Sequence, residues 1–145
     1  MFKHILLPTD GSDRSERAVH GALSLAKELG ATVSGLHVVR PPRAFTISPD
    51  MLDDSREQYV KEAEAQAEKA LMYIVNEAKQ MGVAYNTVMV RANDPYDAII
   101  EVARDKRCDL IAMASHGRRG LEGLLLGSET QKVLTHSVIP VLVFR

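Results

Sequence analysis

Five short apolar runs, separated by stretches with helical spacing, constrain the fold of this chain more than any other feature. Each run is shorter than an ordinary helix, and the first ends at Pro8, which is typical of buried strands. Strands separated by helices generally pair in parallel, because each crossover returns the chain to the same end of the sheet. The predicted strands cover residues 4–7, 32–39, 83–90, 109–114 and 140–144.

Amphipathic helices fill the spaces between the runs. The first is predicted over residues 12–29, with Ser12 or Asp13 as its N-cap and Gly30 at its end. A long helix is predicted over about residues 52–81, with an apolar stripe and a charged remainder. Such a helix can form a coiled-coil arm, but an alanine-rich stripe without sustained heptads favours packing on a sheet.

Two shorter helices complete the pattern. The segment NDP at 93–95 opens the third helix, with Pro95 in its first turn. The segment SETQ at 128–131 fits a capping box and opens the fourth. The order βαβαβαβαβ predicts one α/β domain over residues 1–145, a Rossmann-like open sheet of five parallel strands with helices on both faces.

Composition argues against several functional classes. The formal net charge is −1, which gives no field for nucleic acid or an anionic membrane surface. No window reaches the length of a membrane span, and the first residues lack the apolar core of a secretion signal, so we expect a cytoplasmic protein. The single cysteine, Cys108, excludes an internal disulfide. A lone cysteine can be a nucleophile, but its place before an apolar run favours a helix-to-strand junction.

Three segments bring polar residues or glycine to the carboxyl ends of predicted strands, where open parallel sheets bind their ligands. They are PTDGS at 8–12, HVV at 37–39 and ASHG at 114–117. Asp10 is the best-placed carboxylate of the three segments. It can hold a Mg²⁺ ion carried by a nucleotide, or it can cap the first helix.

A glycine-rich loop over residues 117–127 is the strongest candidate site. Glycines let backbone N–H groups approach an anion closely, and the helix that follows adds free N–H donors and the positive end of its dipole. The Ser128 hydroxyl can bond a phosphate oxygen, or it can merely cap the helix beside a solvent loop. The loop lacks the Gly-Lys-Ser/Thr of a P-loop, and no G-x-G-x-x-G follows the first strand.

Hydrolytic and zinc-binding motifs are missing from the sequence. It contains neither G-x-S-x-G nor H-E-x-x-H. His37 and His116 fall near the predicted site, but a zinc site needs three or more well-spaced ligands, so both are interpreted as pocket or packing residues. Arg118 and Arg119 can reach a phosphate or remain solvated.

The chain resembles the universal stress protein family along its whole length. HILLPTDGS at 4–12 is similar to the family's first strand and turn, and DLIAMASHGRRG at 109–120 to its fourth strand and loop. LLLGSETQKVL and IPVLVFR resemble its closing helix and strand. In the ATP-binding branch the fingerprint is Gly, two residues, Gly, nine residues, Gly and Ser or Thr.

Gly117 and the pair Gly127-Ser128 match the second half of that fingerprint, but Ala114 stands where the first glycine is expected. An alanine is tolerated there if its backbone φ is negative and is disfavoured if φ is positive. The resemblance also implies strand order 3-2-1-4-5 and a homodimer joined through the last strands. Val141 and Val143 would then lie at an antiparallel contact between two edge strands.

The resemblance further implies an ATP site with Mg²⁺, the ion held in part by Asp10. The implied residues surround four parts of the nucleotide. They are Pro8, Thr9 and Asp10 on the ribose and phosphate side, Val38 at the adenine, Met113 and Ala114 at the ribose, and Gly117, Gly127, Ser128 and Glu129 at the phosphates.

Three functions are consistent with these residues. The first is a stress-response module that binds ATP with little or no hydrolysis and acts on an unidentified protein partner. The second is a dimeric interaction protein of the same fold that binds no nucleotide, and Ala114 is its main support. The third is an enzyme that cleaves ATP between its α and β phosphates, which TDGSD at 9–13 resembles only loosely.

Overall fold

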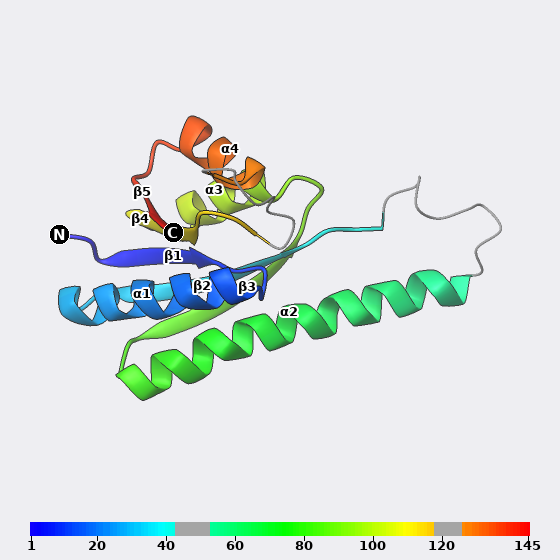
Figure 1. Ribbon diagram of the computed structural model, residues 1–145, viewed down its shortest axis with the longest axis horizontal. Helices are drawn as coiled ribbons and strands as arrows, with labels where there is room; N and C mark the ends of the chain where they lie inside the picture. The colour runs from blue at the N-terminus through cyan, green and yellow to red at the C-terminus, as the bar shows by residue number, and fades with distance from the viewer. Residues whose placement is uncertain (43–52, 118–125) are drawn as a thin grey trace.

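The computed structural model describes residues 1–42, 53–117 and 126–145, and these residues follow the predicted βαβαβαβαβ order (Figure 1). The strands are β1 (His4–Pro8), β2 (Thr32–Val39), β3 (Tyr85–Arg91), β4 (Leu110–Ala114) and β5 (Val141–Phe144). The helices are α1 (Asp13–Leu29), α2 (Asp53–Met81), α3 (Pro95–Asp105) and α4 (Ser128–His136).

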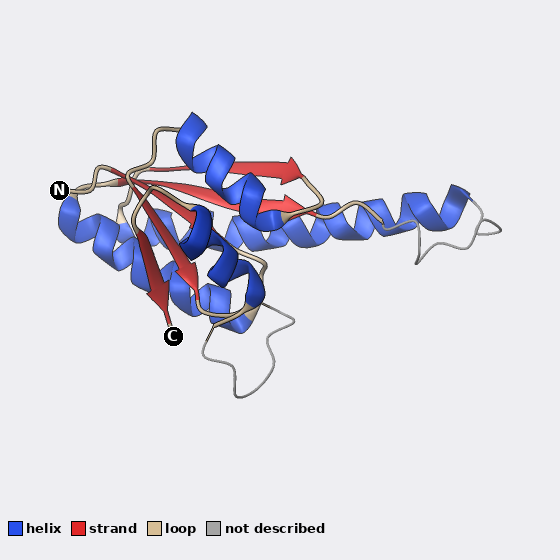
Figure 2. Ribbon diagram, turned by 90° about the horizontal axis from the view of Figure 1, so that it is seen from above, coloured by secondary structure: helices blue, strands red, loops and turns tan. Residues whose placement is uncertain are grey.

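The five strands form one sheet in the order β3-β2-β1-β4-β5, with every pairing parallel, which confirms the predicted fold class. Helices α1 and α2 cover one face, and α3 and α4 cover the other (Figures 1 and 2). Side chains of a strand alternate between the two faces of its sheet. Ile5 and Leu7 therefore pack with α1 and α2, whereas Leu6 packs with α3 and α4, and all three are fully buried.

Helix α1 begins and ends as predicted. Ser12 is its N-cap, and the Ser12 hydroxyl accepts a hydrogen bond from the backbone N–H of Ser15 at 3.3 Å. Gly30 closes the helix in the left-handed conformation, with φ of 63°.

Helix α4 departs from prediction, because its N-cap is Gly127 and not Ser128, and no side chain caps it. The Gly127 N–H donates to the Ser115 carbonyl at 2.7 Å, which holds Gly127 in an extended conformation outside the helix. Ser128 is therefore the first helical residue, one position too late to act as the cap. The predicted capping box is wrong for this reason.

Strand β3 begins two residues later than the predicted residue 83. Gly82 takes the left-handed conformation, and the Val83 N–H donates to the Ala78 carbonyl at 2.9 Å, so Val83 still belongs to the closure of α2. Val83 is buried, so its apolar side chain alone does not mark the boundary between helix closure and strand.

Helix α2 packs on the sheet through its second half only. Residues 67, 70, 71, 74 and 78 are buried, whereas residues 55–59 are exposed. An ion pair from Arg91, at the end of β3, to Glu64 lies where the helix leaves the sheet. Figure 1 shows the first half projecting beyond the strands. The predicted start at Leu52 lies outside the described residues, and no described helix is both long and apolar enough to cross a membrane.

Cys108 lies at the junction between α3 and β4, as predicted. Its side chain is buried, and burial raises the pKa of its thiol to about 11. The Cys108 N–H donates to the Ala103 carbonyl at 2.8 Å, which closes the end of α3. The thiol is therefore protonated at neutral pH and unsuited to nucleophilic chemistry.

Asp109 joins the first residues of β1 to the start of β4. Its two carboxylate oxygens accept the backbone N–H groups of Lys3 at 2.8 Å and His4 at 3.0 Å, and its own N–H donates to the His4 carbonyl at 2.9 Å. Burial alone would raise the pKa of this carboxyl, but the hydrogen bonds from backbone N–H groups and the nearby His4 together outweigh it and hold the pKa below its ordinary value of 3.8.

We expect Asp109→Asn to lower the free energy of unfolding by about 1–2 kcal/mol at neutral pH, because an amide has one acceptor oxygen where the carboxylate has two, and that oxygen is uncharged. A depressed carboxyl pKa stabilises the fold above the unfolded value and ceases to do so as pH falls through the folded value. The difference between wild type and variant should therefore shrink below about pH 4 in urea titrations. A difference that stays constant down to about pH 2 would contradict this role.

Candidate functional site

The ten residues predicted for the site all lie at the carboxyl edge of the sheet or in the first turn of α4. Strand β1 lies between β2 and β4. From β1 the chain first adds β2 and β3 on one side and then crosses over to add β4 and β5 on the other, so the strand order reverses at β1. Open parallel sheets bind ligands at such a reversal, outside the carboxyl ends of the strands. Pro8 and Ala114 end the two central strands, β1 and β4, at this point.

Asp10 organises the turn that follows β1. Its Oδ1 atom accepts the Ser12 N–H at 2.9 Å and the Ser15 hydroxyl at 2.7 Å. Thr9 is buried, and its hydroxyl accepts the Gly11 N–H at 3.1 Å. These bonds fix the carboxylate at the edge of the sheet. Asp10 shapes the turn before α1, while Ser12 is the residue that caps the helix.

Gly117 lies directly against Asp10. A Cβ atom on Gly117 would stand 2.5 Å from the Asp10 Oδ2 atom, far inside van der Waals contact. Only glycine lets the backbone after β4 pass this close to the carboxylate. The segment after β1 and the segment after β4, more than a hundred residues apart in sequence, thus meet at the site.

The start of α4 is tied to the end of β4. The Gly127 N–H donates to the Ser115 carbonyl at 2.7 Å, and the buried Thr130 hydroxyl donates to the Ala114 carbonyl at 3.0 Å. A Cβ on Gly127 would lie 3.3 Å from both the Ser115 oxygen and the His116 Cα, so this approach is tight. The first turn of α4 is therefore held at the carboxyl edge of β4.

Ala114 fits its position without strain. It is buried, and its φ is not positive, because Arg107 is the only non-glycine residue in the described part of the chain with positive φ. Of the two outcomes considered for an alanine here, the structure has the tolerated one.

The Glu129 side chain is bonded within the protein. Its Oε2 accepts the Tyr96 N–H at 2.9 Å, which satisfies a donor in the first turn of α3. Its Oε1 lies 3.4 Å from the Arg40 guanidinium and 3.6 Å from the Lys132 ammonium. Only the backbone N–H of Glu129 is left to serve the site.

Ser128 is exposed, and its hydroxyl caps nothing. The first N–H groups of a helix have no partner within it, so those of Ser128, Glu129 and Thr130 point to the space in front of α4. Together with the positive end of the helix dipole they suit a phosphate.

His116 has a buried ring atom that lacks a partner. Its Nδ1 lies 3.0 Å from the Ser115 hydroxyl, and within the described residues its Nε2 has no hydrogen bond. The residue is only 8% exposed. The ring is close to the start of α4, since a Cβ on Gly127 would lie 3.8 Å from its Cδ2 atom. An unpaired buried nitrogen is costly, which makes it a candidate contact for a bound ligand.

An apolar wall lies beside these polar groups. Val38, near the end of β2, and Met113, in β4, belong to one cluster on the face covered by α3 and α4. Val38 is half-buried and Met113 is buried. The edge thus offers apolar side chains next to backbone donors, a combination suited to a ligand with a flat apolar part and an anionic part.

Sequence reasoning missed two supporting residues, Ser15 and Thr130. Both residues are buried and donate a hydrogen bond to a group of the site, and both stand on helices where a hydroxyl gives no local sign of such a partner. Gly120, Gly123, Arg118 and Arg119 lie outside the described residues. Within the described ranges, no three His, Cys, Asp or Glu side chains are placed to share a metal ion.

Comparison with known proteins gives consistent matches. The model of the Universal stress protein family matches residues 1–145. Universal stress protein MJ0531 of Methanocaldococcus jannaschii is 34% identical over 145 residues, covering 100% of this chain and 83% of the relative. The structure of UspA from Lactobacillus plantarum has a TM-score of 0.86 at 25% identity, over 99% of this chain and 98% of the other.

A universal stress protein in complex with cAMP is also similar in structure. It has a TM-score of 0.73 and 27% identity, over 99% of this chain and 97% of that one.

We expect Gly117→Ala to destabilise the protein by about 1–3 kcal/mol, because the new methyl group displaces the Asp10 carboxylate from its hydrogen bonds. Ser128→Ala is the matched control. Its hydroxyl is exposed and caps nothing, so its effect should stay within about 0.5 kcal/mol. Urea denaturation of both variants measures the difference, and equal stability for Gly117→Ala and wild type would disprove the contact.

Proposed function

The chain belongs to the universal stress protein family, and from that premise we propose that it binds ATP at the carboxyl edge of its sheet. In this proposal ATP occupancy changes the surface that the protein presents to a partner protein in a cytoplasmic stress response. The adenine packs against Val38, the ribose lies beside Met113 and Ala114, and the phosphates lie in front of α4.

The start of α4 is the observation that carries this proposal. Helix α1 is capped by its own Ser12, and the first turn of α3 receives the Glu129 carboxylate, whereas α4 has no side-chain cap. An uncapped helix start at the ligand-binding edge of a parallel sheet suits a phosphate. The buried Nε2 of His116 adds a second unmet polar group in the same place.

The comparison with the cAMP complex supports the same class of ligand. That protein shares 27% of its sequence with this chain over nearly the whole length of both. Cyclic AMP and ATP share the adenine, the ribose and at least one phosphate. Ala114, which was the main support for a protein that binds no nucleotide, has an unstrained backbone and no longer favours that alternative.

Asp10 is the carboxylate proposed to meet a Mg²⁺ ion that arrives with the nucleotide. Mg²⁺ commonly takes one or two protein carboxylates and completes its shell with phosphate oxygens and water. The Asp10 Oδ1 atom already accepts two hydrogen bonds, from the Ser12 N–H and the Ser15 hydroxyl. A carboxylate held in this way is a poor general base for activating water, so we propose that hydrolysis is slow or absent.

Isothermal titration with ATP and Mg²⁺ tests the site. Ser128→Ala should weaken binding about tenfold, since a hydrogen bond to a charged oxygen is lost and about 1.4 kcal/mol is one decade of affinity. Its stability should not change, so the loss would report a ligand contact. Gly127→Val should weaken binding more, because its side chain blocks the start of α4.

Asp10→Asn distinguishes the contribution of the Mg²⁺ ion to ATP binding from that of the phosphates. It should weaken binding chiefly when Mg²⁺ is present, because the carboxylate contacts the ion and not the nucleotide. The site assignment fails if Ser128→Ala and Gly127→Val both bind ATP as wild type does. If stripped wild type shows no binding at all, the protein is better explained as an interaction module of the same fold.

We also propose a homodimer joined through β5. Among the described residues, β5 pairs with β4 on one side only, so its other edge carries unpaired backbone groups. Leu142 on this strand is 37% exposed although it is apolar. A second copy that pairs with this edge would satisfy both features.

Light scattering of Val141→Lys and Leu142→Lys should give monomers where wild type gives dimers, because a charge at the paired edge opposes its own copy in the partner. Val141 packs partly against the core, and Leu142→Lys is the variant that leaves the core intact. Leu134→Lys, at an exposed apolar position on α4, is the control and should remain dimeric. Dimers in both β5 variants would place the interface elsewhere.

A further inference from the structure

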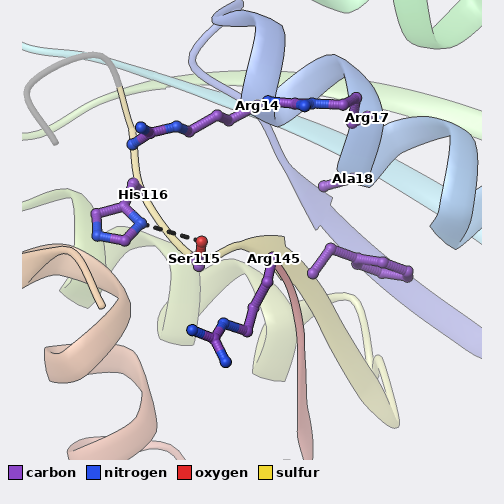
Figure 3. A pocket seen from close by; sticks show the side chains of 7 residues that line it. Arg14, Arg17, Ala18, Ser115, His116 and Arg145 are labelled. Atoms are coloured by element: carbon purple, nitrogen blue, oxygen red, sulfur yellow. Dashed lines mark hydrogen bonds between the residues drawn. The ribbon is translucent and has the colours of Figure 1, made fainter. Parts of the chain in front are cut away.

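A basic pocket lies beside the candidate nucleotide site, between α1, the end of β4 and the end of β5 (Figure 3). Its volume is about 270 Å³. We call it the arginine pocket. It is lined by Arg14, Arg17 and Ala18 of α1, by Ser115 and His116 after β4, and by Phe144 and Arg145 at the end of the chain's last strand.

The three arginines lack negatively charged partners. None of them forms an ion pair with a carboxylate in the described ranges, and no Asp or Glu lines the pocket. Figure 3 shows Arg14 and Arg17 on the α1 side of the pocket and Arg145 on the other side, with the Arg145 side chain directed away from the other two. Guanidinium groups stay charged at any physiological pH, so the side chains that line this pocket favour an anion over a cation.

The position of Arg14 supports a binding role. It stands in the first turn of α1, where the positive end of the helix dipole makes a cation unfavourable. Arg17 follows three residues later and so lies on the same face of the helix. Asp13 and Glu16 stand in the same part of the helix and suit its dipole, but neither forms an ion pair with Arg14 or Arg17 in the described ranges.

The size and charge of the pocket indicate the class of ligand. A volume of about 270 Å³ is just below the ~300–1,000 Å³ of drug-sized ligand sites, so the pocket suits a small group and not a whole nucleotide. Arginine is also the side chain best suited to bidentate contacts with phosphate.

We propose that the arginine pocket binds a diphosphate or longer phosphate group. The group has two plausible chemical sources, a free oligophosphate or the terminal phosphates of a nucleotide whose base lies in the neighbouring site. The two sites share a wall, because Ser115 and His116 line the pocket and Gly117 follows directly in the candidate nucleotide site. The binding of free pyrophosphate does not depend on the proposed ATP site.

Isothermal titration with inorganic pyrophosphate, after any bound ligand has been stripped, tests the proposal. Wild type should show saturable binding with one site per chain. Arg17→Gln with Arg145→Gln should weaken it about tenfold or more, because two charge-assisted contacts are lost. Arg104→Gln is the matched control, since Arg104 is an exposed arginine of α3 outside the pocket, and it should bind within about twofold of wild type.

Competition titrations with ATP and with AMP distinguish the two possible sources of the phosphate group. If saturating ATP prevents pyrophosphate binding while AMP does not, the pocket receives the terminal phosphates of a nucleotide. If neither nucleotide competes, the occupant is a free oligophosphate. Both results support the pocket.

The proposal is overturned if the double variant binds pyrophosphate as wild type does, or if Arg104→Gln weakens binding equally. It is also overturned if Gly127→Val abolishes binding while the arginine variants do not, because the phosphate then lies at α4. Arg17 is exposed and forms no ion pair within the described residues, so the single variant Arg17→Gln should fold normally. Circular dichroism checks this, and the same titration then tests that variant alone.

Discussion

Strand β1 has neither a free edge nor a free face, and the other elements are arranged around it. It pairs with β2 along five residues and with β4 on the other side, while Ile5, Leu6 and Leu7 pack into the two cores. Because such a strand buries both faces, its residues 5–7 are apolar, and two carboxylates lie just beyond its ends. Asp109 meets its first residues, and Asp10 follows its last.

The polar residues at the carboxyl end of β1 serve two neighbouring spaces. On the side of α4, Gly117 and Gly127 bring backbone close to Asp10 and to Ser115. On the side of α1, the same segment after β4 forms a wall of the arginine pocket. Because Ser115 and His116 belong to both, a ligand that shifts one wall changes the shape of the other space. Coupling between the two spaces therefore requires no long-range pathway, because the same residues contact both.

Much of this architecture could be predicted from the sequence, because apolar runs and helical spacing reflect burial directly. The placement of Asp10 and Gly117 at one edge followed from a rule of parallel sheets, although no local pattern indicates that they touch. The wrong prediction at the start of α4 has a local cause. SETQ at 128–131 fits a capping box, but a hydrogen bond from Gly127 to Ser115 moved the cap by one residue. The arginine pocket joins α1 to the end of β5, a pairing that spacing along the chain cannot indicate.

Helix α2 has support from the sheet along only part of its length. The exposed residues that precede Glu64 rely on contacts within the helix, such as the hydrogen bond from Gln58 to Glu62 at 2.8 Å. Isolated helical turns are marginal in water, so the free energy of local opening should rise along the helix from its first turns to the buried Ile74. Amide hydrogens would then exchange with solvent in a graded order. The projecting half would open independently of the sheet, and the half on the sheet only when the whole domain unfolds.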